Sequence, residues 1–301
     1  PALRAEKLCP QAVFVPPDFS RYREASQKIR AIFARHTDLI EPLSLDEAYL
    51  DVTESKLGHS SATAIAESIR AEIRGEIALT ASAGVAPNKF IAKIASDWNK
   101  PDGIFVVRPE QVLDFLAPLK VGRIPGVGRV MEGKLAELGI TTIAQLRAYS
   151  LPALEARFHR YGRRLHELSL GIDEHRVHNE RPTQQISAED TFAEDVALAA
   201  TGLMIETLAS KVWHAALREH ERIARTVVLK LKTREFRILT RSFTPSEPPS
   251  DLATLTRIAL ALRDRVELPA HTRFRLVGVG LGGFIGRELA HSQAELFSGA
   301  D

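Results

Sequence analysis

Two adjacent carboxylic acids, Asp46 and Glu47, are the residues whose types most directly suggest chemistry. They lie in the segment 42–53, Pro-Leu-Ser-Leu-Asp-Glu-Ala-Tyr-Leu-Asp-Val-Thr, whose alternating apolar residues predict two short strands around a tight reversal. Neighbouring side chains of a regular strand point to opposite faces, so both acids reach one ion only if a turn re-aims one of them. Carboxylates are preferred ligands of Mg²⁺, and two such ions support phosphoryl transfer. The alternative is a hairpin turn whose acids are merely solvated.

Three lysines follow, on and after a predicted helix over residues 88–97. Lys89 and Lys93 are one turn apart on its polar face, and Lys100 comes after its end. A lysine in that place offsets the negative end of the helix dipole, which is the structural interpretation. The functional interpretation is a point charge directed at a triphosphate.

A glycine-containing turn, Ile124-Pro-Gly-Val-Gly128, joins two helical patterns. Glycines at the start of a helix leave backbone N–H groups exposed, and such groups bind a backbone phosphate without reading sequence. The turn resembles the helix-hairpin-helix motif of DNA repair and replication proteins, and this resemblance implies that Gly126 and Gly128 contact DNA. The alternative is a tight turn between helices that needs positive φ.

Charge is distributed unevenly along a chain whose net charge is only +2. Residues 38–54 contain six acids and no lysine or arginine, whereas residues 205–244 contain nine basic residues and four acids. A carboxylate-rich region and a separate basic sheet are typical of an enzyme that holds a polyanion and acts on it through a metal. The alternative is two ordinary solvated faces.

Composition excludes several classes of protein. Of the 301 residues, 45% are hydrophobic and 26% are charged, which is not typical of disordered, collagen-like or coiled-coil chains. The single cysteine, Cys9, excludes an internal disulfide framework and a cysteine-based zinc site, and indicates a reducing compartment, here the cytoplasm. Since no run reaches the ~18 apolar residues that a membrane span needs, we expect no membrane partner.

The order of the predicted elements indicates an α+β multidomain protein. Residues 1–108 mix strands and helices, residues 109–178 are helical in pattern, and residues 179–186 form a polar linker. Residues 187–287 have the order β-α-β-β-α-β, which predicts a single open sheet with two helices on one face. A polar tail follows at 288–301. Within the first region we expect strands at 12–15, 80–85 and 103–107, a strand pair within 40–52, and helices at 18–36, 61–76 and 88–97.

The segments 42–53, 80–97, 99–103 and 124–128 resemble the Y family of translesion DNA polymerases, and the resemblance extends through essentially the whole chain. It implies a palm at 1–108, a thumb with a helix-hairpin-helix at 109–178 and a little finger at 187–287. It implies template-directed DNA synthesis past damaged bases by a monomer that uses primer–template DNA, dNTPs and two Mg²⁺ ions.

The resemblance also assigns roles to residues. It implies that Asp46 and Glu47 are catalytic, metal-binding carboxylates and that Lys100 meets the triphosphate. Gly126 and Gly128 would hold a DNA backbone. Phosphates of both strands would be bound by a basic set on the little-finger sheet: Lys230, Lys232, Arg234, Arg237 and Arg241.

The tail contains Gln293-Ala-Glu-Leu-Phe297, which resembles the peptide that binds bacterial polymerases to the sliding clamp. A short peptide with two apolar anchors suits a groove on a partner. We therefore expect Gln293, Leu296 and Phe297 to bind the clamp.

One departure from the family pattern concerns the start of the chain. Family members begin with a strand that carries the first catalytic Asp, followed by a fingers region, and Pro1 falls after that strand and most or all of the fingers. The palm sheet is therefore expected to be incomplete and the activity of this chain impaired. Two alternatives remain: a catalytically inactive fragment that binds DNA and the clamp, and a different palm-type enzyme such as a nucleotide cyclase.

Overall fold

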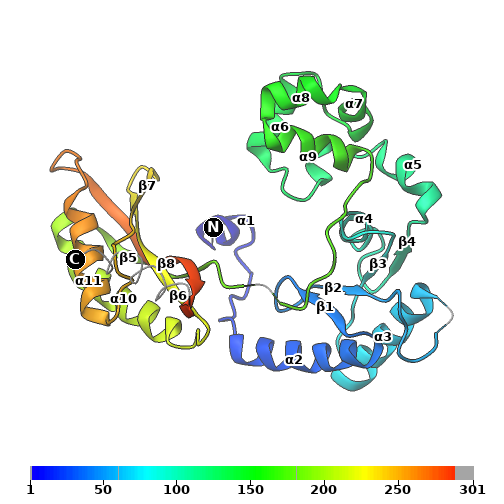
Figure 1. Cartoon of the computed structure of the whole chain (residues 1–301), viewed down its shortest axis with the longest axis horizontal. Helices are drawn as coiled ribbons and strands as arrows, with labels where there is room; N and C mark the ends of the chain where they lie inside the picture. The colour runs from blue at the N-terminus through cyan, green and yellow to red at the C-terminus, as the bar shows by residue number, and fades with distance from the viewer. Residues whose placement is uncertain (1, 60, 181, 289–301) are drawn as a thin grey trace, which may run out of the picture. The chain divides into compact units, whose positions relative to one another are not determined.

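A computed structural model describes residues 2–59, 61–180 and 182–288, and Figure 1 shows their helices and strands. The chain divides into two compact units, Pro1–Arg181 and Pro182–Asp301. Each unit is described by itself.

The N-terminal unit starts with two helices joined by an irregular segment. Helix α1 is Ala2–Leu8, and helix α2 is Phe19–His36, which begins where the side chain of Asp18 accepts hydrogen bonds from the N–H groups of Ser20 and Arg21. The prediction of a strand at 12–15 is wrong. Val13 and Val15 are 86% and 80% exposed, and no strand of the described residues pairs with this short apolar run.

A hairpin and a second helix complete the first part of this unit. Strands β1, Leu39–Pro42, and β2, Ala48–Asp51, pair antiparallel around the reversal that the sequence predicts. Helix α3, Ala62–Ile77, begins at Ser61, whose side chain accepts the N–H of Ala64. Its isoleucines form a small core with Ile32 of α2: Ile65, Ile69 and Ile73.

A β-α-β segment follows. Strand β3, Ala83–Val85, pairs parallel with strand β4, Ile104–Val106, and helix α4, Lys89–Ala95, connects them. Gly84 lies directly beneath α4, because a Cβ added there would collide with the backbone oxygen of Ala92 and the backbone nitrogen of Ser96. The absence of a side chain at this position sets the close approach of α4 to the strands.

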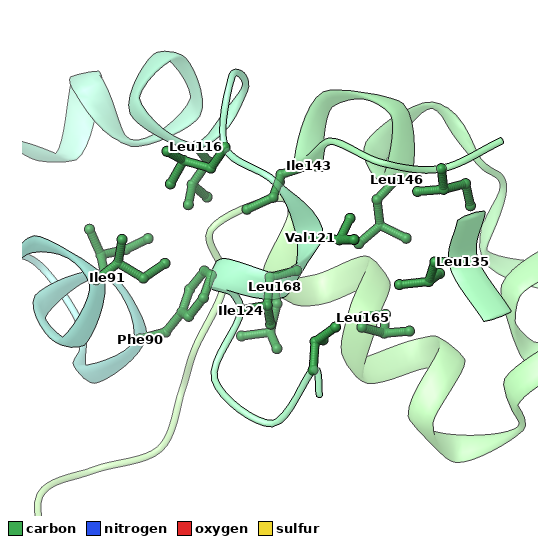
Figure 2. Close-up of a cluster of buried hydrophobic side chains, with 14 of the residues drawn as sticks. Phe90, Ile91, Leu116, Val121, Ile124, Leu135, Ile143, Leu146, Leu165 and Leu168 are labelled. Atoms are coloured by element: carbon green, nitrogen blue, oxygen red, sulfur yellow. The ribbon is translucent and has the colours of Figure 1, made fainter. Parts of the chain in front are cut away.

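Residues 172–178 are neither helix nor strand, so the prediction of a helical region as far as 178 is wrong for this stretch. Short helices form residues 109–169, as predicted. They are the 3₁₀ turns η1, Pro109–Gln111, and η2, Val121–Arg123, and the helices α5, Val112–Leu116, α6, Arg129–Ala136, α7, Ile143–Ala148, α8, Leu151–Phe158, and α9, Arg160–Ser169. Their buried side chains form one continuous cluster with Phe90 and Ile91 of α4 (Figure 2). One hydrophobic core therefore positions both α4 and the glycine turn.

The segment 171–179, which we call the return segment, leads from α9 back to the strands and α4. Its bonds are Asn88 Nδ2 to the oxygen of Gly171 (2.8 Å), Phe90 N to Asp173 Oδ2 (3.1 Å), Lys89 Nζ to the oxygen of Arg176 (2.7 Å), His178 N to Glu41 Oε2 (3.1 Å) and Ile40 N to Asn179 Oδ1 (2.8 Å). These bonds attach β1 and the start of α4 to the same stretch of chain.

The C-terminal unit has the predicted β-α-β-β-α-β order. Its elements are β5, Gln185–Ala197, η3, Leu198–Thr201, α10, Gly202–Ala216, β6, Arg222–Thr233, β7, Ile238–Phe243, α11, Leu252–Asp264, and β8, Arg273–Gly286. The antiparallel sheet has the order β5-β8-β6-β7, and α10 and α11 cover one face (Figure 1). Strand β5 begins at Gln185, inside the stretch 179–186 that the sequence predicts to be a linker, and extends to Ala197 because its pairing with β8 resumes at Val196 after a bulge.

The return segment contains a buried acid with a testable contribution to stability. Asp173 accepts hydrogen bonds from Arg164 Nη2 (2.6 Å), His175 Nδ1 (2.6 Å) and Phe90 N (3.1 Å). Burial is the largest single influence on the Asp173 carboxyl and raises its pKa, but the bonds from His175 and Arg164 together outweigh burial and leave the pKa below its usual value.

We expect Asp173→Asn to lower the free energy of unfolding by about 1–3 kcal/mol at pH 7. A carboxyl whose pKa is lower in the folded state stabilises the fold above its unfolded pKa of about 3.9, and this contribution disappears as the pH falls through the folded pKa. Denaturant melts of both proteins at pH 7 and near pH 3 should show that the difference between their free energies of unfolding is smaller in acid. A difference of constant size would contradict this role for the Asp173 charge.

Candidate active site and nucleic-acid interface

The acidic pair lies in the turn between β1 and β2. The backbone oxygen of Glu47 accepts the N–H groups of Leu43 (2.9 Å) and Ser44 (3.3 Å), which closes the turn. The Ser44 hydroxyl donates to Asp46 Oδ1 at 2.6 Å, and both acids are exposed. Because the pair lies outside the regular strands, the alternation that would send its side chains to opposite faces does not apply.

Lysines from α4 and the following residues face this turn. Glu47 Oε1 lies 2.5 Å from Lys93 Nζ, and Asp97 Oδ1 lies 2.7 Å from Lys100 Nζ. The hydrogen bond to Asp97 is the main cause of a raised Lys100 pKa, and the negative charges of Glu47 and Asp46 contribute further. Lys100 is therefore within the electrostatic field of the acidic pair.

Arg123, in η2, is close to the same group of charges. The pKa of Asp97 is lowered first by its hydrogen bond with Lys100, and the charges of Lys93 and Arg123 lower it as well. Lys93 of α4 thus contacts Glu47 of the hairpin, Lys100 lies in reach of the charges of both hairpin acids, and Arg123 of η2 is near Asp97. A region of this kind can hold a cation on its carboxylates and phosphate oxygens on its lysines.

Lys89 is directed elsewhere. Its Nζ lies 2.7 Å from Glu41 Oε2, and the two side chains are only 15% and 3% exposed. Lys89 therefore takes part in a buried ion pair next to the return segment, although it is one helical turn from Lys93.

The donor chemistry of the hairpin fits a magnesium ion that shares its ligands with a substrate. Mg²⁺ in proteins is usually held by one or two carboxylates, with phosphate oxygens and water as the other ligands. Asp46 and Glu47 offer two such carboxylates. Within residues 2–59, 61–180 and 182–288, no three or more His, Cys, Asp or Glu side chains come together in a way that could hold a metal ion.

The two glycines of the predicted DNA-binding turn differ in whether the backbone conformation requires glycine. Gly126 has φ of +93°, a conformation that residues with a side chain rarely adopt. Gly128 has φ of −92° and precedes α6 as its N-cap, and a Cβ there would meet no atom within 4 Å. The backbone requires glycine at 126 but not at 128, where a side chain would have open space.

The pairing register distributes the predicted basic residues of the C-terminal sheet. Lys230 and Lys232 alternate with buried Leu229 and Leu231, so they lie on the face away from α10 and α11, which we call the open face. Arg241 pairs with Leu229 and therefore belongs to the helix-covered face, on edge strand β7. Arg234 and Arg237 lie in the turn between β6 and β7, where Arg234 Nε is 3.8 Å from Asp195 Oδ2.

Strand β8, which lies between β5 and β6, has glycines on the open face near its centre. Gly278 of β8 lies between Glu189 of β5 and Lys230 of β6, and Gly280 follows two residues later. Glu189 Oε2 and Lys230 Nζ are 2.6 Å apart across Gly278. Glu189 was not predicted as part of this surface, because only the pairing of strands far apart in sequence places it there.

The described residues contain no helix that is both long and apolar enough to cross a membrane. The predicted clamp-binding residues Gln293, Leu296 and Phe297 lie outside the described residues.

Family comparisons match all three parts of the chain. The impB/mucB/samB family matches residues 1–97, the C-terminal domain of that family matches residues 183–296, and the thumb domain of DNA polymerase-iota matches residues 122–173. Two annotated relatives are DNA polymerase IV of Xanthomonas campestris pv. campestris strain 8004 and of Neisseria gonorrhoeae strain FA 1090. The first is 61% identical over 99% of this chain and 83% of its own length, and the second is 48% identical over 93% of this chain and 79% of its own length.

Solved structures show the same fold. A Y-family DNA polymerase chimera of Dbh and Dpo4 superposes with a TM-score of 0.85 at 26% identity, over 95% of this chain and 82% of its own. An insertion ternary complex of Dbh DNA polymerase superposes with a TM-score of 0.62 at 26% identity, over the same shares of the two chains. This chain belongs to the Y family of translesion DNA polymerases, which are DNA-directed nucleotidyltransferases.

Proposed function

We propose that the residues of the acidic hairpin and of α4 perform template-directed nucleotidyl transfer on primer–template DNA and dNTPs, with Mg²⁺ as the metal. The observation that carries this proposal is the acidic pair in the turn, where Glu47 lies 2.5 Å from Lys93 Nζ, with Lys100 held by Asp97 after the same helix. In the reaction, the primer 3′ oxygen forms a bond to the α-phosphorus of the dNTP. The bond from that phosphorus to the bridging oxygen breaks, pyrophosphate leaves with the electron pair, and the hydroxyl proton passes to water.

The residues have separate roles in this proposal. Asp46 and Glu47 would hold Mg²⁺, which when bound neutralises phosphate charge and lowers the barrier to attack. Lys100 places a positive charge near the triphosphate oxygens. Lys93, which neutralises Glu47 before substrate enters, becomes available to phosphate once the carboxylate binds a cation.

DNA would be bound in both units. The exposed N–H groups after Gly128 suit a phosphate of the DNA backbone. On the C-terminal sheet, Lys230 and Lys232 suit phosphates on the open face, and Arg234, Arg237 and Arg241 add positive charge along the β6–β7 hairpin.

The number of carboxylates supports a finer proposal about the 301-residue chain taken by itself. In the part of the chain that the structure describes, the acidic turn offers two carboxylates, and two metal ions there would leave coordination positions that a further acid would fill. We therefore propose that this chain alone extends primers poorly while still binding DNA.

Primer extension tests both the proposed reaction and the proposed poor activity of the 301-residue chain alone. We expect the 301-residue chain to extend a primer with Mg²⁺ and dNTPs at least ~10²-fold more slowly than the same chain joined to the N-terminal segment of a DNA polymerase IV relative. In the extended protein, Asp46→Asn should abolish extension and leave DNA affinity unchanged. Glu54→Gln, an exposed acid of the same acidic stretch, is the matched control and should leave both unchanged.

Two results would count against it. Extension that survives Asp46→Asn would remove this acid from the reaction, and rapid extension by the unmodified chain would refute the proposed impairment.

The glycine turn gives a prediction in which stability and DNA binding change in different directions. Ser is a preferred N-cap residue, so Gly128→Ser should leave the melting temperature unchanged or raise it. Its hydroxyl would accept the N–H groups proposed for phosphate, so affinity for primer–template DNA should fall about tenfold. Gly75→Ser on α3, where an added Cβ also meets no atom within 4 Å, is the control for a new surface hydroxyl. Equal DNA affinity of the Gly128 variant and the unmodified chain would contradict the phosphate contact.

We further propose that Gln293, Leu296 and Phe297 bind the bacterial sliding clamp, on the strength of the peptide resemblance. Titration calorimetry of the chain with purified clamp tests this independently of catalysis. Replacing Leu296 and Phe297 by Ala should weaken binding at least tenfold, because both apolar anchors are lost, whereas Ser298→Ala should not. Undiminished binding by the double variant would exclude the peptide as the contact.

A further inference from the structure

The turn between β6 and β7 holds an aromatic residue in an unfavourable conformation. Phe236 has φ of +67°, which is rare for a bulky residue. Hydrogen bonds from Phe236 N to the oxygen of Thr233 (2.9 Å) and from Thr233 N to the oxygen of Arg237 (2.9 Å) fix the turn. Glycine would adopt this conformation without strain. Phe236 is also 59% exposed, so burial of its ring does not compensate for the strain.

Two cations lie against this ring. Arg275 Cζ is 4.1 Å and Lys232 Nζ is 4.7 Å from the centre of the Phe236 ring. They come from β8 and β6, and more than half of Phe236 stays open to solvent. In the part of the chain that the structure describes, neither cation has an acidic partner within 4.0 Å. Both charges are therefore available to an anionic group beside the ring.

An exposed aliphatic side chain lies on the open face beside Lys232, one of these two cations. Ile238 pairs with Lys232 in the register of β6 and β7, which places it on the same face, and it is 56% exposed. We call Phe236, Ile238, Lys232 and Arg275 the hairpin-tip patch. The patch combines an open aromatic ring, an exposed aliphatic side chain and two unpaired positive charges.

We propose that the hairpin-tip patch binds an unpaired DNA base. Phe236 stacks on the base, and Lys232 and Arg275 bind the adjoining phosphates. The proposal rests on the proposed DNA-binding function and adds a specific ligand to it. A ring beside cations matches the alternation of π face and phosphate along a single strand. In a duplex the neighbouring base pairs cover both faces of each base, so an open ring gains little from it. A protein that bound only backbone phosphates would gain nothing from Phe236, whereas the cost of its φ would remain.

Fluorescence anisotropy with labelled oligothymidine and with a blunt-ended duplex, at several KCl concentrations, tests this inference in the full chain. We expect Phe236→Gly to raise the melting temperature by a few degrees, because the strain is relieved. The same change should lower affinity for the single strand about 5- to 150-fold, which corresponds to ~1–3 kcal/mol per stacked base. The dependence of its affinity on salt should not change, because no charge is lost. Affinity for the duplex should stay the same.

Two further variants separate stacking from charge and from general apolar contact. Lys232→Gln should weaken binding of both oligonucleotides and reduce the single-strand salt slope by about 0.7. Phe236→Leu should weaken single-strand binding, whereas Phe243→Leu, at the far end of β7, should not.

Unchanged single-strand affinity of Phe236→Gly would overturn the inference, and so would equal losses on single strand and duplex. If the unmodified chain bound neither the single strand nor the duplex, the proposed DNA-binding function itself would be refuted.

Discussion

The buried ion pair between Glu41 and Lys89 is the interaction on which the arrangement of the N-terminal unit depends. Glu41 comes from β1, immediately before the acidic turn, and Lys89 opens α4. The carboxylate also accepts the N–H of His178, and the ammonium group also donates to the oxygen of Arg176. A charge buried alone would be very unfavourable, so each partner requires the other. The pair therefore links the hairpin to α4, and a second ion pair between the same two elements joins Glu47 to Lys93.

A similar balance of charge is found in both units. Glu47 is paired with Lys93 next to the proposed metal site, and Glu189 is paired with Lys230 on the open face of the sheet. In the proposed function, a metal would replace Lys93 as the partner of Glu47, and a phosphate would replace Glu189 as the partner of Lys230. Binding of nucleic acid or nucleotide at the proposed sites would then be an exchange of ion partners, which costs less than exposing or burying an unpaired charge. These ion pairs weaken the attraction of the two surfaces for a ligand. They also keep like charges on each surface from repelling one another while no ligand is bound.

Sequence patterns predict most of the local structure and less of the site. The helix at 19–36 and the hairpin around Asp46 follow from periodicity and turn chemistry, which are local properties. The apolar run at 12–15 has the right composition for a strand, but a strand needs a hydrogen-bonding partner that composition cannot supply. Proximity of Arg123 to Asp97, and of Glu189 to Lys230, depends on contacts between distant segments, so no local pattern indicates either.

The core that α4 shares with the thumb helices has a consequence for how this molecule can be divided. Phe90 and Ile91 are buried in the same cluster as Leu135 and Leu165, so a boundary drawn between α4 and the helices that follow it would cut through a single hydrophobic core. Replacing those helices with the helices of a relative would therefore require side chains that still fit against Phe90 and Ile91.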